Sequence, residues 1–447
     1  GRRGRRFESC HPDLTIESSQ PGSGRCFLAL SRGFQESCLN SRTTSERPVS
    51  RVRSSFALSL GVGLLAWVFS LILYSPRLTL FLGAGSGDTR RDDLLLQCLD
   101  PLSRELWEPL LAYRVVQPVL AHWLGWCGER RDWLALLGSP GIAYFALVLA
   151  LACVYWALSR RFSGAIALLA TFALATTQFT QWTNTLWGHP DSLTLLPTAV
   201  LMCTFNPIVV LLMSFIGIVN DERFVLALPF LLLWWWPASV SFRSIIRRFW
   251  PQALAFLVAI GLTVALRLML THGVLGPGVV DPYRGGGSLF LSFLSRLLDP
   301  VRWPELAFMV LLGFRWLWLL PLLVWFQQFR QRANWRSALY LASLPLCVVA
   351  TVTSADISRN CSFFFPVIPV ALEFLISING WSQGKVKVFL AWILGLNILT
   401  PAAMVFYFPP LWWKTNPLEW KDWATLYLPL PVNLWQWFRV PNGAASW

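Results

Sequence analysis

The sequence predicts an all-α polytopic membrane protein with about eleven transmembrane helices and a large first extracytoplasmic loop that carries interfacial helices. Of the 447 residues, 55% are hydrophobic and 13% are charged, whereas a soluble domain has about 25% charged residues. Several apolar runs are long enough to cross a bilayer as helices. The alternating segments typical of a membrane β-barrel are not found in the sequence.

Residues 1–54 are rich in Arg, Ser and Gly, and we expect them to be disordered because they offer no apolar core. The transmembrane domain is predicted over 55–410, and a Trp- and Pro-rich extracytoplasmic tail over 411–447. The predicted spans are 55–82, 138–158, 163–182, 192–219 as a hairpin of two short helices, 224–240, 249–271, 306–326, 337–353, 363–378 and 388–408.

The hairpin is predicted from a turn signal, Asn206-Pro207, at the centre of an apolar stretch that is too long for one helix. Two short passes return the chain to the side that it left. We therefore expect four polar residues that flank the hairpin to emerge on one membrane face, namely His189, Asp191, Asp221 and Glu222. The alternative is that these residues are polar only because loops are wet.

The distribution of charge predicts which loops face the cytoplasm. Most short loops between spans are basic, whereas the acidic loop residues fall in the alternate set, which includes the long loops 83–131 and 272–305. Because cytoplasmic loops carry the excess of Lys and Arg, the acidic loops are predicted to be extracytoplasmic. The run 109–125 is short and contains Arg114 and His122, so we predict an interfacial or re-entrant helix there.

Net charge and cysteine content exclude some classes of partner and site. A charge of +14 in a soluble protein would suggest nucleic acid, but here the bases lie in short loops between apolar runs, so we expect membrane lipid and no nucleic acid as partner.

The nine cysteines include no CxxC pair, which predicts neither a disulfide framework nor a metal site. We expect no cofactor and leave a divalent cation open, and the sequence does not define an oligomeric state. Three cysteines inside apolar runs are expected to be core residues, namely Cys153, Cys203 and Cys347.

The first outer loop contains the candidate catalytic residues Asp88, Asp92 and Asp93. A carboxylate just outside the first span is suited to act as general base toward a hydroxyl acceptor. The neighbouring Arg90 and Arg91 are suited to hold phosphate oxygens. The alternative interpretation is a solvated charge cluster that neutralises itself.

The residues beside the hairpin are candidate substrate-binding residues. Asp191 directly precedes an apolar run and is expected to cap that helix, and His189 can exchange protons near neutral pH. Asp221, Glu222 and Arg223 form a charged group between two apolar helices. Charges at membrane depth are usually paired or functional, so we expect Arg223 to bind substrate or to pair with Asp191 or Glu222.

Two further arginines are candidate phosphate ligands on the same face. Arg359 follows Asp356 by three residues, a spacing that places both on one helix face. Arg284 precedes the glycines 285–287, on a loop that could close over a substrate or serve only as a linker. Carboxylates, arginines and apolar helices together are the combination that a lipid-linked phosphate donor requires.

The chain resembles the GT-C superfamily of integral-membrane glycosyltransferases, the polyprenyl-phosphate-sugar-dependent proteins of bacteria. The resemblance extends over about residues 55–410 and depends on four features: the acidic first outer loop, Tyr113-Arg114 followed by Pro118, Gly188-His189-Pro190-Asp191 with the helix pair and Asp221-Glu222-Arg223, and Asp356-x-x-Arg359. It implies inverting transfer of a sugar from a polyprenyl phosphate on the outer face of the plasma membrane, with a first-loop Asp as base. The sequence departs from the family pattern in having three candidate Asp residues and in lacking a large soluble C-terminal domain.

Two other classes of function remain compatible with the sequence. A transporter or flippase of lipid-linked or small anionic substrates would place charges within broken helices, and Arg267 is the intramembrane charge that favours it. A membrane assembly factor without chemistry is the third class.

Overall fold

The computed structural model describes residues 55–73, 97–101, 114–127, 133–185, 189–236, 242–275, 298–330, 334–352 and 357–400. These residues are helical and contain no strand, which confirms the all-α prediction for this part of the chain. Several predictions fall outside the described residues: those for 1–54, for Asp88, Asp92 and Asp93, for Arg284 and the following glycines, for Asp356, and for 411–447.

The described residues include five helical segments that are long and apolar enough to cross a membrane, or six if one bent pair is counted as a span. The five are α2 (Phe56–Leu73), Pro140–Ser159 of α6 (Trp133–Ser159), Arg247–Thr271 of α12 (Phe242–Thr271), Leu306–Arg330, and α16 (Trp335–Val352). These helices indicate a membrane-embedded protein, whereas the expected number of about eleven passes remains a prediction.

The predicted hairpin is confirmed as two short packed helices, α9 (Ser192–Cys203) and α10 (Pro207–Asn220). Asn206 is the N-cap of α10, and its side chain accepts a hydrogen bond from the amide of Ile208 at 2.9 Å. Pro207 occupies the first turn, where its missing N–H costs nothing. After α10 the chain continues through η2 (Glu222–Ala227) into α11 (Leu228–Trp235).

The predicted span 163–182 is two helices, α7 (Gly164–Ala175) and α8 (Gln178–Thr185). The break coincides with Thr176 and Thr177, whose hydroxyls donate to carbonyls three residues back at 2.6 and 2.7 Å. Such local bonds compete with the helical ladder. The polar α8 begins here, and its residues 178–184 are buried among other helices rather than exposed to lipid. The apolar character of 163–182 predicted a single span. The structure has two helices because Thr176 and Thr177 end the first of them.

The span Leu306–Arg330 is interrupted at its centre by Arg315. The chain passes from α14 (Trp303–Phe314) through η4 (Arg315–Trp318) into α15 (Leu319–Arg330), with Arg315 at a left-handed φ of 55°. The Arg315 guanidinium donates to the carbonyl of Thr176 at 2.9 Å and to that of Thr400. These carbonyls end α7 and α19 (Gln383–Leu399), and a cation at a helix C-terminus is favourable.

Two further arginines donate hydrogen bonds to carbonyl groups at the C-terminus of α11. Arg336 donates to the carbonyl of Leu233 at 3.0 Å, and Arg161 to that of Trp234. Glu373 lies between the two arginines, 2.7 Å from Arg161 and 3.1 Å from Arg336. This triad joins α16 and α11 to α18 (Val367–Ser377) and to the turn after α6, on the loops that the sequence predicts to be cytoplasmic.

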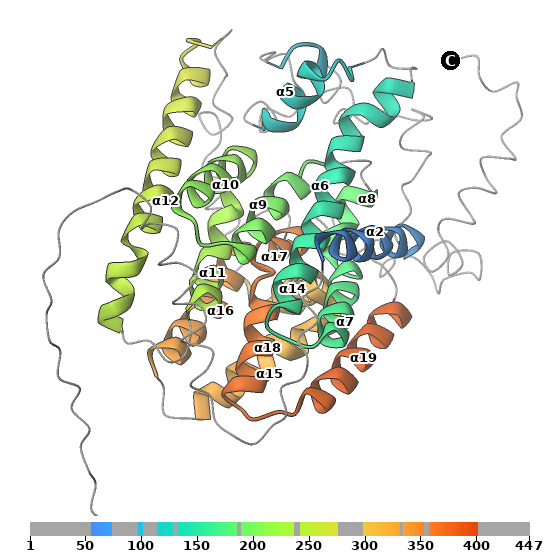
Figure 1. Ribbon diagram of the computed structural model, residues 1–447, viewed down its shortest axis with the longest axis vertical. Helices are drawn as coiled ribbons and strands as arrows, with labels where there is room; N and C mark the ends of the chain where they lie inside the picture. The colour runs from blue at the N-terminus through green and yellow to red at the C-terminus, as the bar shows by residue number, and fades with distance from the viewer. Residues whose placement is uncertain are drawn as a thin grey trace, which may run out of the picture. The chain divides into compact units, whose positions relative to one another are not determined.

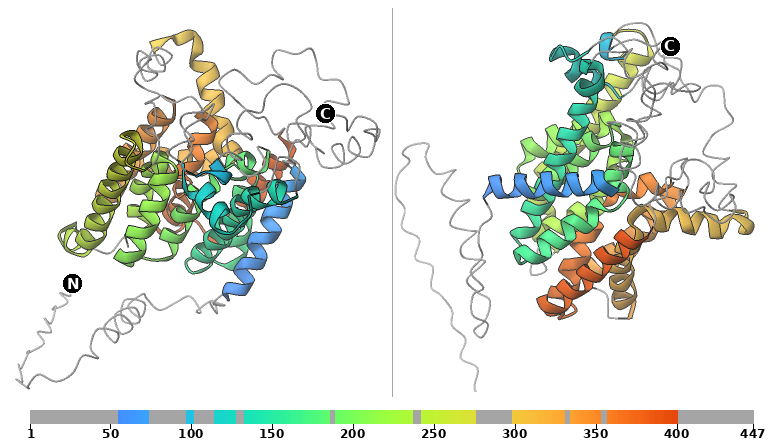
Figure 2. Two further views of the ribbon diagram at one scale, coloured as in Figure 1. Left: turned by 90° about the horizontal axis from the view of Figure 1, so that it is seen from above. Right: turned by 90° about the vertical axis from the view of Figure 1, so that its right-hand side faces the viewer.

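The bent pair is formed by the segment Ile357–Phe364, comprising α17 (Ile357–Cys361) and η5 (Ser362–Phe364), and by α18, with a bend of 52°. All residues from 357 to 372 are buried. The ring of Phe364 contacts Phe230, Phe314 and Trp318 with centroid separations of 6.0, 5.4 and 6.0 Å. α17 packs against α14, α16 and α8, among the helices drawn in Figures 1 and 2. Because its residues are buried, side chains on α17 are held by the core.

The prediction that no disulfide framework exists is wrong in one place, because Cys98 and Cys127 are bonded, with their Cα atoms 5.5 Å apart. The two residues are separated by 29 positions, and α5 (Val116–Trp123) lies between them in the sequence. Because neither residue belongs to a local motif, spacing did not reveal the pair. The interior positions expected for the unbonded Cys153, Cys203 and Cys347 are confirmed: the first two are half-buried and Cys347 is buried.

Gly313 permits the close approach of α14 and α17. A Cβ at this position would lie 2.4 Å from Cys361 Cβ, 2.8 Å from Cys361 Sγ and 3.1 Å from the carbonyl oxygen of Ser358. The first two contacts are shorter than atoms tolerate and the third is tight, so a side chain here must displace Cys361 and with it α17.

We predict that Gly313→Ala lowers the thermal unfolding midpoint of the purified protein by several degrees, since overpacking costs about 1–3 kcal/mol. Gly261→Ala is the matched control, because a Cβ on that helical glycine meets nothing within 4 Å. Differential scanning fluorimetry in detergent measures both variants. Equal midpoints for Gly313→Ala and wild type would contradict the close packing.

Candidate functional site

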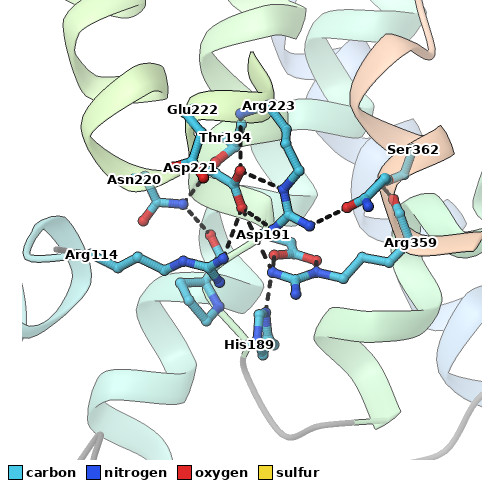
Figure 3. Close-up of polar contacts among 12 residues, drawn as sticks. Arg114, His189, Asp191, Thr194, Asn220, Asp221, Glu222, Arg223, Arg359 and Ser362 are labelled. Carbon is cyan, nitrogen blue, oxygen red and sulfur yellow. Dashed lines mark hydrogen bonds and ion pairs between the residues drawn. The ribbon is translucent and has the colours of Figure 1, made fainter. Parts of the chain in front are cut away.

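Five charged side chains from different parts of the chain converge at one place (Figure 3). Asp191 and Asp221 lie at the centre, and the guanidinium groups of Arg114, Arg223 and Arg359 approach them from different directions. Asp191 precedes α9, Asp221 follows α10, and Arg359 lies in α17. The hairpin thus brings its two polar ends together, as the sequence predicted, and α17 adds an arginine from far along the chain.

Asp191 forms a two-pronged ion pair with Arg359. The Arg359 Nε and Nη2 atoms lie 2.6 and 2.5 Å from the two carboxylate oxygens of Asp191. Asp191 occupies the N-cap position of α9, but its side chain makes no capping hydrogen bond, so the predicted capping role is wrong. The carboxylate is turned to the arginine instead, because a bidentate guanidinium contact is stronger than a bond to one backbone N–H.

Asp221 is the most heavily bonded acid of the cluster. It accepts from Arg114 Nη2 at 3.0 Å, from Arg223 Nε at 2.7 Å, and from the backbone amide of Arg223 at 3.0 Å. Arg223 also bonds the amide oxygen of Asn360, and Arg359 Nη2 lies 3.8 Å from Asp221. The expectation that Arg223 pairs with Asp191 or Glu222 is wrong, because Asp221 is the nearer acid.

Asn220 fastens the two ends of the hairpin to each other. Its side-chain amide donates to the carbonyl of Pro190 and to the hydroxyl of Thr194, each at 2.8 Å. Because Pro190 adjoins Asp191 and Asn220 adjoins Asp221, these bonds fix the spacing of the two carboxylates.

His189 lies at the edge of the cluster, with Nδ1 3.0 Å from Asp191 Oδ1. Its ring makes an edge contact with Trp182 at a centroid separation of 6.0 Å, and the Trp182 ring also lies 5.3 Å from the Arg359 guanidinium carbon. Burial lowers the pKa of His189 to about 4, with Asp191 opposing the shift and Arg359 adding to it. The imidazole is therefore neutral near pH 7, and the charges of the site come from the arginines and aspartates.

Both aspartates are held ionised. Burial alone would raise their pKa values, but Arg359 and then His189 outweigh it at Asp191, and Arg223 and then Arg114 outweigh it at Asp221, so that both pKa values lie below the ordinary 3.8. Burial lowers the pKa of Arg114 from 12.5, with Asp221 opposing the shift, yet a guanidinium keeps its proton in proteins. The cluster is thus made of permanent charges.

The exposed edge of the cluster is cationic. The side chains of Arg114 and Arg223 are 14% and 19% exposed, whereas those of Arg359, Asp191 and Asp221 are at most 4% exposed. An incoming group therefore meets two guanidinium groups before either carboxylate. Anions with several oxygens, such as phosphates, match this surface because arginine donors are arranged for planar, paired contacts.

Glu222 lies apart from the buried cluster. Its side chain is 57% exposed and lies 2.8 Å from Arg267 Nη2. Arg267, which the sequence suggested as an intramembrane charge, is thus ion-paired near the end of α12 with the solvent-exposed Glu222.

The structure brings together six of the candidate residues: Arg114, His189, Asp191, Asp221, Arg223 and Arg359. Five others lie outside the described residues: Asp88, Asp92, Asp93, Arg284 and Asp356.

Three residues of the site were missed from the sequence: Asn360, Thr194 and Trp182. Asn360 directly follows Arg359 in the polar run 358–360, and Trp182 lies in a run of Thr, Gln and Asn inside a predicted span. A polar residue within an apolar run is the signal that could have found Thr194. The position of Asn360 directly after the candidate Arg359 is the signal that could have found Asn360. Trp182 gave no signal among the 26 tryptophans of the chain.

Comparisons of the chain with protein-family models, with curated proteins and with solved structures found no match. The residues and their geometry are therefore the basis for any functional conclusion.

We predict that stability declines as the pH falls from about 6.5 toward 4, since over this interval the unfolded chain binds a proton at His189 that the folded protein excludes. The His189→Gln variant should show a flatter dependence of unfolding midpoint on pH. The stabilising pairs of Asp191 and Asp221 are lost only below about pH 4, because their folded pKa values lie below 3.8. The exposed His272→Gln variant is the control, and identical slopes for wild type and His189→Gln would contradict the burial of a neutral imidazole.

Proposed function

We propose that the protein is an integral-membrane glycosyltransferase that moves a sugar from a polyprenyl-phosphate donor to an extracytoplasmic acceptor. The observation that supports this proposal most is the pair of partly exposed guanidinium groups of Arg114 and Arg223, both anchored on the buried carboxylate of Asp221. An anchored arginine pair is pre-oriented, so an arriving phosphate meets donors that need no reordering.

In the proposed reaction the acceptor hydroxyl attacks the anomeric carbon of the sugar. A carbon–oxygen bond forms to the acceptor, the bond from the anomeric carbon to the phosphate oxygen breaks, and polyprenyl phosphate leaves with one more negative charge. Arg114 and Arg223 stabilise the charge that develops on the leaving phosphate. The hydroxyl proton passes to a carboxylate acting as general base.

Asp191 and Asp221 are poorly suited to be that base. Each is fixed by arginine donors at 3.0 Å or less, and each has a lowered pKa. A base needs a free lone pair and a pKa closer to the working pH. We therefore keep the first-loop residues Asp88, Asp92 and Asp93 as the candidates for the base, and Arg284 and Asp356 as candidate substrate contacts.

An apolar groove supports the choice of a lipid-linked donor. It encloses about 330 Å³ between α14, α15 and α16 and is lined by residues that include Leu311, Trp318, Leu322, Phe326, Leu344 and Val348. One wall, α14, also packs on α17, which carries Arg359. A hydrocarbon chain in this groove would be held beside the helix that contributes to the charged cluster.

Two observations support an extracytoplasmic location for the site. The disulfide joins Cys98 to Cys127 in the segment that carries Arg114, and disulfides persist in oxidising compartments. The short loops that contain Arg161 and Arg336, on other parts of the chain, are basic, as cytoplasmic loops are. We propose a bacterial plasma-membrane protein with about eleven passes, in which short helices such as α9 and α10 complete the count.

A transporter of anionic substrates is the second candidate, and the broken span at Arg315 favours it. Transporters place substrate sites at interrupted helices near the midplane. Against this, Arg315 already binds the carbonyls that end α7 and α19, so it has a structural use. A transporter would move the intact lipid-linked sugar without cleaving it.

We predict that a polyprenyl monophosphate raises the thermal midpoint of the wild-type protein, since a ligand that binds only the folded state stabilises it. The matching uncharged polyprenol should give a smaller shift. Arg114→Gln and Arg223→Gln should each weaken polyprenyl monophosphate binding by about tenfold or more, because a hydrogen bond to a charged group contributes about 1.5–3 kcal/mol.

Arg247→Gln, an exposed arginine on α12, is the control and should bind as wild type does. Equal responses to the phosphate and the alcohol would contradict the proposed site. Transfer of labelled sugar from a polyprenyl-phosphate sugar then separates the two functions, because a transporter leaves the donor uncleaved. Full transfer by each of Asp88→Asn, Asp92→Asn and Asp93→Asn would show that the base is another group.

A further inference from the structure

The disulfide encloses the chain segment that delivers Arg114 to the site. Cys98 lies before Arg114 in the sequence and Cys127 after it, and α5 follows Arg114 by two residues. The bridge therefore joins the segment 97–101 to the residues that follow α5. The remaining two arginines of the cluster, Arg223 and Arg359, lie outside this enclosed segment.

The bridge also lies in a packed setting. Cys98 is buried against Ala121 of α5, Ile142 and Ala146 of α6, and Leu193 of α9. The carbonyl oxygen of Cys98 lies 3.0 Å from His122 Nδ1. Gln117, Pro118 and Ala121 form the buried face of α5. The disulfide thus reinforces the contact of α5 with α6, and α6 is one of the long apolar helices.

Arg114 differs from the other two arginines in how its backbone is held. Arg359 belongs to a stretch, 357–372, in which every residue is buried, and Arg223 follows Asp221 in η2, directly after the packed helix α10. Arg114 has neither support. Within the described residues its position depends on its bond to Asp221, on the neighbouring Val115, which packs beside Leu270 of α12, and on the attachment of the eight-residue helix α5. A helix this short is not stable by itself.

We propose that the Cys98–Cys127 disulfide is a positioning device that holds Arg114 at the anion-binding edge of the cluster, so that reduction weakens binding of the donor phosphate through Arg114. The proposal rests on the function proposed above. Its physical basis is conformational entropy: without the bridge α5 has more open states, and binding must then order Arg114 at the cost of affinity. A dithiol supplies the two electrons and two protons that convert the disulfide into two thiols, and it is itself oxidised to a disulfide.

A double-mutant cycle tests this coupling. The variants are Cys98→Ser with Cys127→Ser, Arg114→Gln, and all three substitutions together, and the probe is polyprenyl monophosphate bound to purified protein in nanodiscs. We expect each of the first two variants to bind about tenfold more weakly than wild type, and the combined variant to bind no more weakly than Arg114→Gln alone. Non-additivity of this kind identifies residues that act through one another.

Reduction of the wild-type protein with dithiothreitol should reproduce the effect of the paired serine substitutions and should not affect the serine variant. This arm also serves if the serine variant fails to fold, because the reduced and oxidised protein are the same chain. Cys153→Ser is the control for loss of an unbonded thiol and should not change the affinity. Amide hydrogen exchange over residues 116–123 should rise on reduction, since α5 opens more often.

The outcomes separate the inference from the function on which it rests. Additive losses of affinity, or unchanged exchange in α5 after reduction, would overturn the positioning role and leave the phosphate site intact. Wild-type affinity in Arg114→Gln would instead refute Arg114 as a phosphate ligand, whatever the exchange of α5 shows.

Discussion

The ion pairs of Asp191 and Asp221 with three arginines are the interaction on which the rest of the site depends. Burying two carboxylates among apolar helices costs several kcal/mol for each ion unless partners compensate. Here the partners come from before α5, from η2 and from α17. Removing any one partner leaves a buried charge without its full compensation, so the cluster specifies how these elements sit together. The same anchoring fixes the two partly exposed guanidinium groups, those of Arg114 and Arg223, at the edge of the cluster.

A second theme is the use of arginine at the ends of helices inside the protein. Short helices leave carbonyl groups unpaired at their C-termini, and in an apolar environment those groups need donors. Arg315 supplies them to α7 and α19, and Arg161 and Arg336 supply them to α11. This explains how a chain with interrupted apolar runs, such as Leu306–Arg330, remains packed. It also gives the buried Arg315 a structural reason that does not require a transport role.

Much of the organisation was predictable because residues that are close together in the sequence determine it. Asn206-Pro207 predicted the hairpin, and the hairpin predicted that Asp191 and Asp221 emerge on one side; in the structure Arg359 approaches both. Pairings across the chain were not predictable: Arg359 and Asp191 are 168 residues apart, and Cys98 and Cys127 share no motif. The break after α7 was missed because hydropathy outweighed two threonines that bond their own helix. The capping role predicted for Asp191 was wrong because that rule considers only the helix that the residue precedes. The carboxylate is instead oriented by Arg359, which lies on α17.

We propose that Arg114 and Arg223 form the receiving surface for a phosphate carried by a lipid. The most direct measurement is a cryo-electron microscopy map of the protein in a nanodisc with bound polyprenyl monophosphate. We expect phosphate density within hydrogen-bonding distance of both guanidinium groups, with Asp221 still paired behind them. Phosphate density at another part of the protein, with this arginine pair unchanged and unoccupied, would contradict it.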